Sequence, residues 1–326
     1  MTHVSFSGYP KGWFVVAFSS ELPIGGVKPI RYFGRDLVLF RAEDGGVHVL
    51  DAYCPHLGAH LGYGGEVVGS TIQCPFHAWR FDACGACIDI PYVKNGKIPP
   101  GAKVGSWPTR DLNGVIMVWH DRTGAPPEFD IPPIAEFGSE RWLPWSTKLY
   151  AEVKTHPKEI VDNLADKAHF PAVHKTEIDD FGFEVNGHLA TQMVKGRAFF
   201  EGGVDQFESR TTYHGPGYLL MRMSGLLENY MLVAHTPISE NRLDLRLAVM
   251  LKIVGDRKRT EGYVGMYLKN LQTGFEDDFK IWETKVYRDR PVLCDGDGPI
   301  GHLRKWYRQF YASSPDAAGV DAQSAE

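Results

Sequence analysis

The sequence predicts an α+β fold, with an all-β N-terminal domain followed by a second domain that combines an antiparallel sheet with one long helix. In the first 119 residues, short apolar runs such as WFVVAF and VHVLDAY alternate with glycine and proline, which is typical of short strands. From about residue 190 to 253, longer runs such as LDLRLAVMLKI predict an antiparallel sheet. Apolar residues then recur at steps of three and four from roughly Gly262 to Tyr287, which indicates a helix.

A proline-rich stretch separates the two predicted domains. The segment PPEFDIPPI, residues 126–134, has high proline density and no periodicity, which is typical of a boundary. We therefore expect one domain over residues 1–130 and a second over 131–312. The tail, residues 313–326, reads SSPDAAGVDAQSAE. Its residues are small and polar, and we expect them to be disordered.

Composition excludes several classes of protein. The 326 residues are 43% hydrophobic and 23% charged, as in ordinary globular proteins, and they are enough for two domains with a substantial core. A net charge of -5 gives no basic footprint for nucleic acid. No apolar run is long enough to span a membrane, and MTHVSFSGYP lacks the pattern of a signal peptide. These features predict a cytoplasmic protein.

A first set of possible metal ligands lies in two short motifs. Cys54-Pro55-His56 is followed by Cys74-Pro75-Phe76-His77, so each motif supplies one cysteine and one histidine. A Cys₂His₂ zinc site is the alternative, but its usual spacing groups the two cysteines and the two histidines separately. The division found here favours a [2Fe–2S] cluster, in which the cysteines bind one iron and the histidines bind the other.

The remaining cysteines carry weaker signals. Cys84 and Cys87 form a Cys-Gly-Ala-Cys pair, and no second pair exists to complete a zinc tetrahedron. A turn with two free thiols is therefore favoured over a redox or zinc half-site. Cys294 stands alone and is assigned no role.

A second set of possible ligands lies in the stretch DNLADKAHFPAVH, Asp162 to His174. We expect a helix from Pro157 to about Phe170, and a kink at Pro171 that brings His174 back beside His169. Two histidines and one carboxylate form the usual protein ligand set of a mononuclear iron(II) site with open positions. His169 and His174 are thus the candidate histidine ligands.

The late helix offers the carboxylate. Asp278 falls on its apolar stripe, whereas Asp277 points about 100° away. A buried carboxylate is costly unless it is paired or binds a metal, so Asp278 is the favoured third ligand and a salt bridge to an internal arginine is the alternative.

Two polar residues near the histidines have further candidate roles. Asp166 could accept a hydrogen bond from a ligand imidazole, or bridge to a cluster histidine on another protein surface. Asn163 lies one turn before Asp166 and could line the metal pocket.

These motifs, in this order, resemble the oxygenase component of Rieske non-haem iron oxygenases. The resemblance runs from about Trp13 to Tyr311. The motifs DAYCPHLGAHL, CPFHAWRF and DNLADKAHFPAVH carry it at the superfamily level. IWETKVYRDRPVLCDGDGPI and RKWYRQFY are most similar to the branch of 3-ketosteroid 9α-hydroxylases and cholesterol 7-desaturases.

The resemblance implies a Rieske domain followed by a helix-grip catalytic domain, with a [2Fe–2S] cluster and mononuclear Fe(II). It also implies a head-to-tail homotrimer, in which Asp166 connects His77 or His56 of one subunit to His169 of the next. Electrons would come from NAD(P)H through a separate reductase, because the chain shows no dinucleotide fingerprint.

The implied function is a terminal oxygenase that uses O₂ to hydroxylate an apolar polycyclic substrate, a 3-ketosteroid, by a 9α-hydroxylation type of reaction. Two alternatives remain open at this point. One is a Rieske demethylase or desaturase acting on another small molecule, which has the same iron site. The other is a Rieske electron carrier without catalysis, which would lack the mononuclear iron.

Overall fold

The computed structural model describes residues 8–200 and 203–311, although the side chains of residues 200, 266, 268 and 270–273 are not part of that description. The tail predicted to be disordered, 313–326, lies outside the described residues. The described chain forms two compact units. The N-terminal unit comprises residues 13–133, and the C-terminal unit comprises residues 8–12 with 134–311. The limits of 1–130 and 131–312 as functional domains stay a prediction.

The N-terminal unit consists of three antiparallel sheets, as the short apolar runs predict. Their strand orders are β1-β11-β10, β2-β3-β4-β9 and β5-β6-β7-β8. The strands β1 and β11, whose sequences GWFVVAF and VIMVWH are almost wholly apolar, are buried along their full length. The bounds of the strands are β1 Gly12–Phe18, β2 Val27–Tyr32, β3 Arg35–Arg41, β4 Val47–Asp51, β5 Glu66–Val68, β6 Thr71–Gln73, β7 Arg80–Phe81, β8 Cys87–Asp89, β9 Ser106–Trp107, β10 Thr109–Leu112 and β11 Val115–His120, and the 3₁₀ helix η1 spans Ser19–Glu21.

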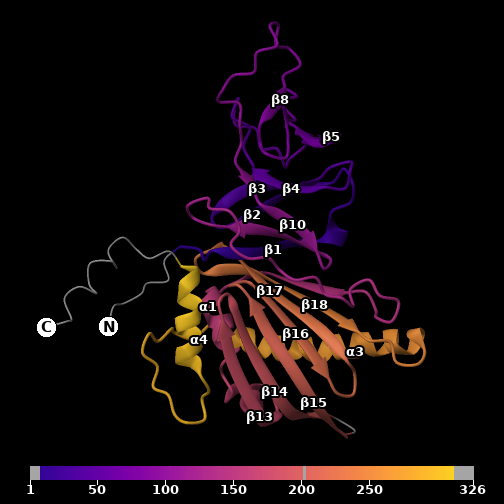
Figure 1. Cartoon of the computed structure of the whole chain (residues 1–326), viewed down its shortest axis with the longest axis vertical. Helices are drawn as coiled ribbons and strands as arrows, with labels where there is room; N and C mark the ends of the chain where they lie inside the picture. The colour runs from indigo at the N-terminus through magenta and orange to yellow at the C-terminus, as the bar shows by residue number, and fades with distance from the viewer. Residues whose placement is uncertain (1–7, 201–202, 312–326) are drawn as a thin grey trace, which may run out of the picture. The chain divides into compact units, whose positions relative to one another are not determined.

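The C-terminal unit contains a seven-stranded antiparallel sheet with the strand order β12-β18-β17-β16-β15-β14-β13 (Figure 1). The first strand in the chain therefore pairs with the last, and the other strands follow one another as a meander. The bounds are β12 Ser146–Val153, β13 Thr176–Asn186, β14 Leu189–Phe200, β15 Gly203–His214, β16 Tyr218–Ser224, β17 Asn229–Ser239 and β18 Arg242–Leu251.

The long helix α3, Arg257–Trp282, crosses one face of this sheet, behind its strands in Figure 1. Val264, Tyr267 and Phe275 on the helix pack against a buried cluster that includes Leu245 and Leu247 of β18. This packing confirms the predicted combination of an antiparallel sheet with one long helix.

The predicted bounds of this helix, Gly262 to Tyr287, are wrong by five residues at each end. The helix begins earlier because the Asp256 side chain caps it by accepting a hydrogen bond from the Arg259 N–H (3.3 Å). It ends at Trp282, where the Thr155 hydroxyl donates to the Trp282 carbonyl (3.4 Å) and so satisfies one of the last free carbonyls.

The single helix predicted from Pro157 to Phe170 is also wrong, because two short helices occupy this stretch. They are α1, Pro157–Asp162, and α2, His169–His174. The break precedes Pro171, which lies in the first turn of α2, where a missing N–H leaves no helical hydrogen bond unmade. No kink at Pro171 is therefore needed. The remaining helices are α4, Ile300–Tyr307, and the 3₁₀ helix η2, Arg308–Phe310.

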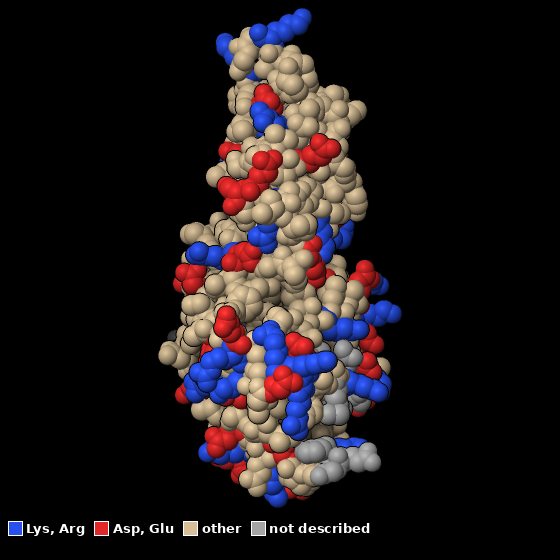
Figure 2. All heavy atoms as spheres, turned by 90° about the vertical axis from the view of Figure 1, so that its right-hand side faces the viewer, with Lys and Arg blue, Asp and Glu red and all other residues tan. Residues whose placement is uncertain are grey.

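Two features of the described residues bear on partners. None of their helices is both long enough and apolar enough to cross a membrane. On the face drawn in Figure 2, acidic and basic side chains are interspersed.

The packing of α3 on the sheet gives a first prediction. Leu247→Ala should lower the free energy of unfolding by about 2–5 kcal/mol, because the side chain is fully buried beneath the helix and the substitution leaves a cavity. Denaturant unfolding followed by circular dichroism measures the change. Leu226→Ala is the control, since Leu226 is 68% exposed, and it should change stability little. Equal effects of the two substitutions would contradict the assigned packing.

Two candidate metal sites

The first set of predicted ligands lies on two loops of the N-terminal unit that have the same conformation. In one loop, Cys54 N–H donates to the Ala59 carbonyl (2.9 Å) and Gly58 N–H donates to the Cys54 carbonyl (3.0 Å). In the other, Cys74 N–H donates to the Trp79 carbonyl (2.8 Å) and Ala78 N–H donates to the Cys74 carbonyl (3.1 Å). The fourth residue after each cysteine has a positive φ, 77° at Gly58 and 58° at Ala78. The two cysteines therefore occupy equivalent positions in their loops, whereas the histidine follows the cysteine by two residues in one loop and by three in the other.

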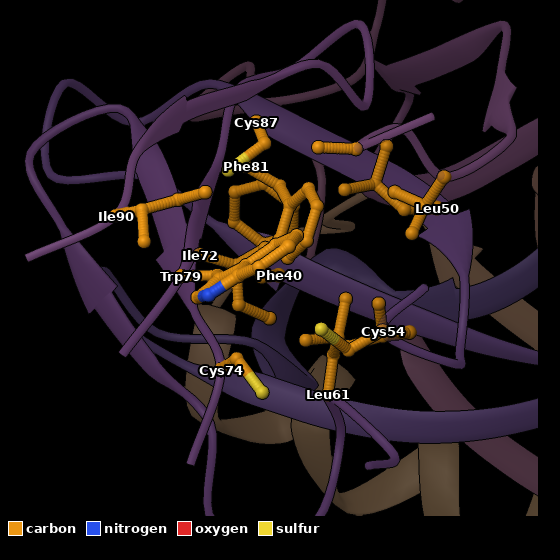
Figure 3. Packing of buried hydrophobic residues seen from close by; sticks show 13 residues of the cluster. Phe40, Leu50, Cys54, Leu61, Ile72, Cys74, Trp79, Phe81, Cys87 and Ile90 are labelled. Carbon is orange, nitrogen blue, oxygen red and sulfur yellow. The ribbon is translucent and has the colours of Figure 1, made fainter. Parts of the chain in front are cut away.

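The four predicted ligands come together in pairs. Cys54 and Cys74 are both buried and lie at the edge of the core cluster, with their sulfur atoms turned toward the same space (Figure 3). Burial raises the pKa of the Cys54 thiol to about 11, and the neighbouring Cys74 contributes to the shift. The imidazole rings of His56 and His77 lie 4.6 Å apart, centroid to centroid. Two adjacent buried thiols and two adjacent imidazoles fit a cluster that needs both kinds of donor, since bound iron replaces the thiol protons.

Aromatic residues support the histidines of this set. The His56 ring stacks on Trp79 with centroids 4.7 Å apart and planes within 10° of parallel. The Trp79 indole N–H in turn donates to the Tyr92 hydroxyl (2.7 Å). Tyr92 is a residue that the sequence reasoning missed, because no spacing rule connects it to the two motifs.

The other cysteines take no part in either set. All five cysteines are free thiols. Cys84 lies in a turn that Asp82 closes by accepting hydrogen bonds from the Cys84 and Ala86 N–H groups (both 2.9 Å), in keeping with the predicted turn. Cys84 and Cys294 are exposed, whereas Cys87 is buried.

The second set of predicted ligands converges in the C-terminal unit. One ligand atom from each of His169, His174 and Asp278 lies within 4.8 Å of the other two. Within the described part of the chain, this is the trio of side chains close enough together to bind one metal ion. The histidines occupy the first and last residues of α2, and their rings lie 5.1 Å apart. His174 Nε2 is 3.5 Å from the Asp278 carboxylate on α3.

The backbone of Asp166 determines which nitrogen of His169 faces the trio. His169 Nδ1 lies 2.6 Å from the Asp166 carbonyl oxygen. A carbonyl oxygen only accepts hydrogen bonds, so Nδ1 must carry the proton and Nε2 keeps its lone pair for a metal. Burial also lowers the pKa of His169, which favours the neutral ring that metal binding requires.

Asp278 lies where the helical period predicts it. Its side chain is only 9% exposed, whereas the neighbouring Asp277 pairs with Lys280 at the surface (2.8 Å). Within the described residues the Asp278 carboxylate faces His174, and not the internal arginine of the alternative interpretation. A buried carboxylate facing two imidazoles is the environment that a divalent metal ion stabilises.

The two polar residues with further candidate roles have definite contacts. The Asp166 carboxylate accepts a hydrogen bond from the His169 N–H (3.2 Å), and its side chain remains one-third exposed. The Asn163 side-chain oxygen accepts a hydrogen bond from the Trp282 indole N–H (3.3 Å), so it links the start of this segment to the end of α3. Direct roles of Asp166 and Asn163 in a reaction stay predictions.

Two glycines that the sequence reasoning missed allow close approach at this site. A Cβ atom at Gly274, one turn before Asp278, would lie 3.3 Å from His174 Nδ1. A Cβ atom at Gly298, where φ is +83°, would lie 2.2 Å from the Ala165 carbonyl oxygen. A glycine on the apolar side of a long helix is the one sequence signal that could have identified Gly274.

The crowding at Gly274 gives a second prediction. Gly274→Ala should weaken binding of one divalent ion, measured with Co²⁺, by about tenfold, because the new methyl group displaces the His174 ring from the trio. Gly265→Ala on the same helix is a matched control, since a Cβ there meets no atom within 4 Å. Ligand-field absorbance titration measures both. Unchanged Co²⁺ affinity in Gly274→Ala would contradict the assigned position of His174.

Both units match known protein families. Residues 12–108 match the Rieske [2Fe-2S] domain, and residues 118–311 match the 3-ketosteroid 9alpha-hydroxylase C-terminal domain. The second match alone covers more than half of the chain.

Similar proteins cover nearly the whole chain. A 3-ketosteroid-9-alpha-monooxygenase oxygenase component of Rhodococcus rhodochrous is 36% identical over 94% of this chain and 83% of its own length. The corresponding protein of Mycobacterium tuberculosis is 31% identical over 94% and 83%. A cholesterol 7-desaturase of Ciona intestinalis is 30% identical over 94% and 69%.

Solved structures show the same fold. A dicamba monooxygenase crystal structure has a TM-score of 0.76 at 20% identity, covering 94% of this chain and 98% of its own. NdmA of Pseudomonas putida CBB5 has a TM-score of 0.72 at 19% identity, covering 91% and 88%. A Rieske [2Fe–2S] cluster and a mononuclear iron are thus the cofactors of this protein. With both units matched, the chain belongs to the Rieske non-haem iron oxygenases, as an oxygenase component of the branch that contains the 3-ketosteroid 9α-hydroxylases and cholesterol 7-desaturases.

Proposed function

We propose that this protein is a terminal oxygenase that hydroxylates an apolar polycyclic substrate, a 3-ketosteroid, by a 9α-hydroxylation type of reaction. It uses O₂ and electrons from a separate NAD(P)H-dependent reductase. The observation that carries the proposal is the convergence of His169, His174 and Asp278 in a chain that also carries the two cluster loops. Relatives named as 3-ketosteroid-9-alpha-monooxygenase oxygenase components support the substrate class and the separate reductase.

The ligand assignments follow from the two sets of side chains. Cys54, Cys74, His56 and His77 would hold the [2Fe–2S] cluster, and His169, His174 and Asp278 would hold the iron. When both groups are bound, the cluster supplies electrons and the iron activates dioxygen for attack on a substrate C–H bond.

The chain contributes the placement and the charge of the three ligands at the iron-binding trio. Three protein ligands leave coordination positions open. The Asp166 carbonyl holds His169 in the tautomer that presents Nε2 (2.6 Å contact at Nδ1). Half-buried Phe275 and Phe279 lie beside Asp278 on α3 and pack on the apolar cluster of the sheet. This packing fixes the part of α3 that carries Asp278.

Asp166 is assigned a role between the two metals. Its backbone already holds His169, and its carboxylate remains one-third exposed and so is accessible to a group on another subunit. In a head-to-tail homotrimer, this carboxylate would connect His169 to His77 or His56 of the next subunit. Asn163 accepts a hydrogen bond from Trp282 (3.3 Å) and would hold the chain before Asp166 against the end of α3.

Two alternatives predict different outcomes. A demethylase or desaturase would use the same ligands, and only analysis of the product separates it from a hydroxylase. A non-catalytic electron carrier would not require His169, His174 and Asp278 to converge, so their convergence is evidence for an enzyme.

Product analysis tests the substrate class. With a matching reductase, NADH, O₂ and androstenedione, the protein should form a steroid that contains one additional oxygen atom, identified by mass spectrometry. Desaturated steroid or demethylation of a non-steroid would favour the first alternative. Absence of turnover with every steroid tried, by protein loaded with cluster and iron, would overturn the steroid assignment.

Iron content tests the ligand assignment. His169→Ala should lower the iron content from about three to about two atoms per chain, while the visible spectrum of the cluster is unchanged, because the cluster ligands lie elsewhere. His188→Ala is a control outside both sites. If His169→Ala keeps its full iron content, His169 is not a ligand.

The bridging role of Asp166 has a separate test. Asp166→Asn keeps an oxygen that can accept from the His169 N–H but removes the charge, so both metals should remain bound. Product formation in a single turnover of the pre-reduced protein should become slower by about 10²-fold or more. Asp180→Asn, at an exposed position, is the matched control. An unchanged single-turnover rate would exclude the bridge.

A further inference from the structure

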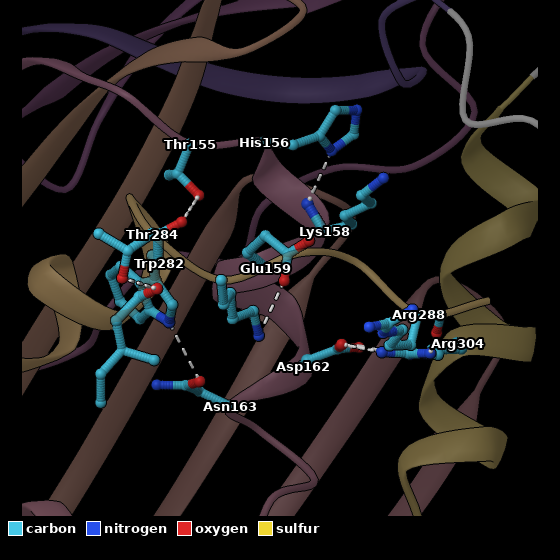
Figure 4. A network of polar contacts seen from close by, with 12 residues as sticks. Thr155, His156, Lys158, Glu159, Asp162, Asn163, Trp282, Thr284, Arg288 and Arg304 are labelled. Atoms are coloured by element: carbon cyan, nitrogen blue, oxygen red, sulfur yellow. Dashed lines mark hydrogen bonds and ion pairs between the residues drawn. The ribbon is translucent and has the colours of Figure 1, made fainter. Parts of the chain in front are cut away.

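A polar network connects the segment before the iron-binding histidines with the chain that follows α3 (Figure 4). From the α1 side, Glu159 pairs with Lys285 (2.8 Å) and Asp162 pairs with Arg304 of α4. Glu159 and Asp162 are both buried. None of these residues stands out in the sequence, because charged residues separated by more than 100 positions carry no pattern.

The contact between Asp162 and Arg304 is the strongest link of this network. Arg304 Nε donates to both carboxylate oxygens of Asp162 (3.0 and 3.2 Å), and Arg304 Nη2 donates to Oδ2 (2.6 Å). Arg304 Nη1 also donates to the Arg288 carbonyl (2.7 Å). Both charged groups are largely removed from water, with side-chain exposures of 10% for Asp162 and 12% for Arg304.

Tyr287 extends the same contact. The Arg304 guanidinium lies 4.6 Å from the centre of the Tyr287 ring, and the Lys158 ammonium of α1 lies 3.8 Å from it. The electron-rich ring is thus attracted to both cations. This arrangement keeps the segment after α3 against α1.

Asp162 lies close in sequence to the iron-binding histidines, so its contact with Arg304 bears on their position. Asp162 is the last residue of α1, and His169 is the first residue of α2. The six residues between them form no regular structure, so their path depends on contacts with other elements. Two of these are Gln192 Nε2, which donates to the Leu164 carbonyl (2.8 Å), and the Asp297 carbonyl, which accepts from the Lys167 N–H (3.3 Å). Arg304 fixes the point at which this path begins.

We propose that Arg304 is a positioning residue for the iron site, acting through Asp162 on the placement of His169 and His174 relative to Asp278. The inference rests on the proposed iron ligands. Removing one partner of a buried ion pair leaves an uncompensated charge, so loss of Arg304 should displace Asp162 toward solvent and take the end of α1 with it. The bound iron would then lose the preformed arrangement of its ligands.

The readout is the affinity of the full-length protein for Fe²⁺, measured by chelator competition after removal of the mononuclear iron with the cluster intact. Arg304→Ala should weaken Fe²⁺ binding by about tenfold, in the range found when residues that orient metal ligands are replaced. Arg304→Lys keeps the charge but not the fork of donors, and it should restore part of the affinity. If Arg304→Ala does not fold, the test uses Arg304→Lys alone, which should bind Fe²⁺ about threefold more weakly than the parent protein.

A control separates positioning from a general loss of stability. Arg242 pairs with Glu152 on the surface (3.0 Å, side chains 51% and 64% exposed), and Arg242→Ala should leave Fe²⁺ affinity unchanged. In addition, Asp162→Ala and Arg304→Ala should be non-additive, so that the double variant binds Fe²⁺ no more weakly than the weaker single variant. Hydrogen exchange of amides 163–174 in the iron-depleted protein should be faster in Arg304→Ala and unchanged in Arg242→Ala.

The outcomes distinguish this inference from the proposed function. Fe²⁺ affinity within twofold of the parent in both Arg304 variants, while His169→Ala abolishes binding, overturns the positioning role alone. Additive effects of Asp162→Ala and Arg304→Ala would also overturn it. If His169→Ala itself leaves Fe²⁺ affinity unchanged, the ligand assignment fails, and with it the proposed function.

Discussion

The contact between α2 and α3 is the constraint on which the rest of the C-terminal unit depends. His174 Nε2 and the Asp278 carboxylate lie 3.5 Å apart although more than 100 residues separate them in the chain. This distance requires a fixed position of α3 on the sheet, which the apolar cluster of β17, β18 and the helix provides. It also requires a helix surface that admits an imidazole ring, and Gly274 provides that surface. The sheet thus serves as the rigid support for two short ligand-bearing elements.

In the N-terminal unit, contacts between residues close in sequence position the predicted ligands. Its four predicted ligands come from two loops of the same conformation, each closed by hydrogen bonds between backbone groups five or fewer residues apart. The loops need only be brought side by side by short hairpins. A motif of this kind can be found in a sequence, because spacing within a loop determines geometry within that loop.

Features that depend on residues close in sequence could be predicted from the sequence, whereas features that depend on distant contacts could not. The α+β fold and the convergence of His169, His174 and Asp278 were predictable, since motif spacing and helical period are properties of neighbouring residues. The single helix through Phe170 and the kink at Pro171 were wrong. The carbonyl groups of Leu164 and Ala165 are contacted by Gln192 and Gly298, which lie far along the chain, and nothing within the helix pattern indicates those contacts. The contact of Arg304 with Asp162 could not be predicted either, because the two residues lie far apart in the sequence.

The separation between the ligands of the two sites also orders the assembly of the protein. All residues assigned to the cluster lie between Cys54 and His77, and the core around them is built from residues 38–104 of the same unit. The trio of the second site includes a residue of α3, and contacts between distant parts of a chain form late because long loops must close first. The trio of the second site is complete only when α3 has docked on the sheet, so this site depends on the folding of the whole C-terminal unit.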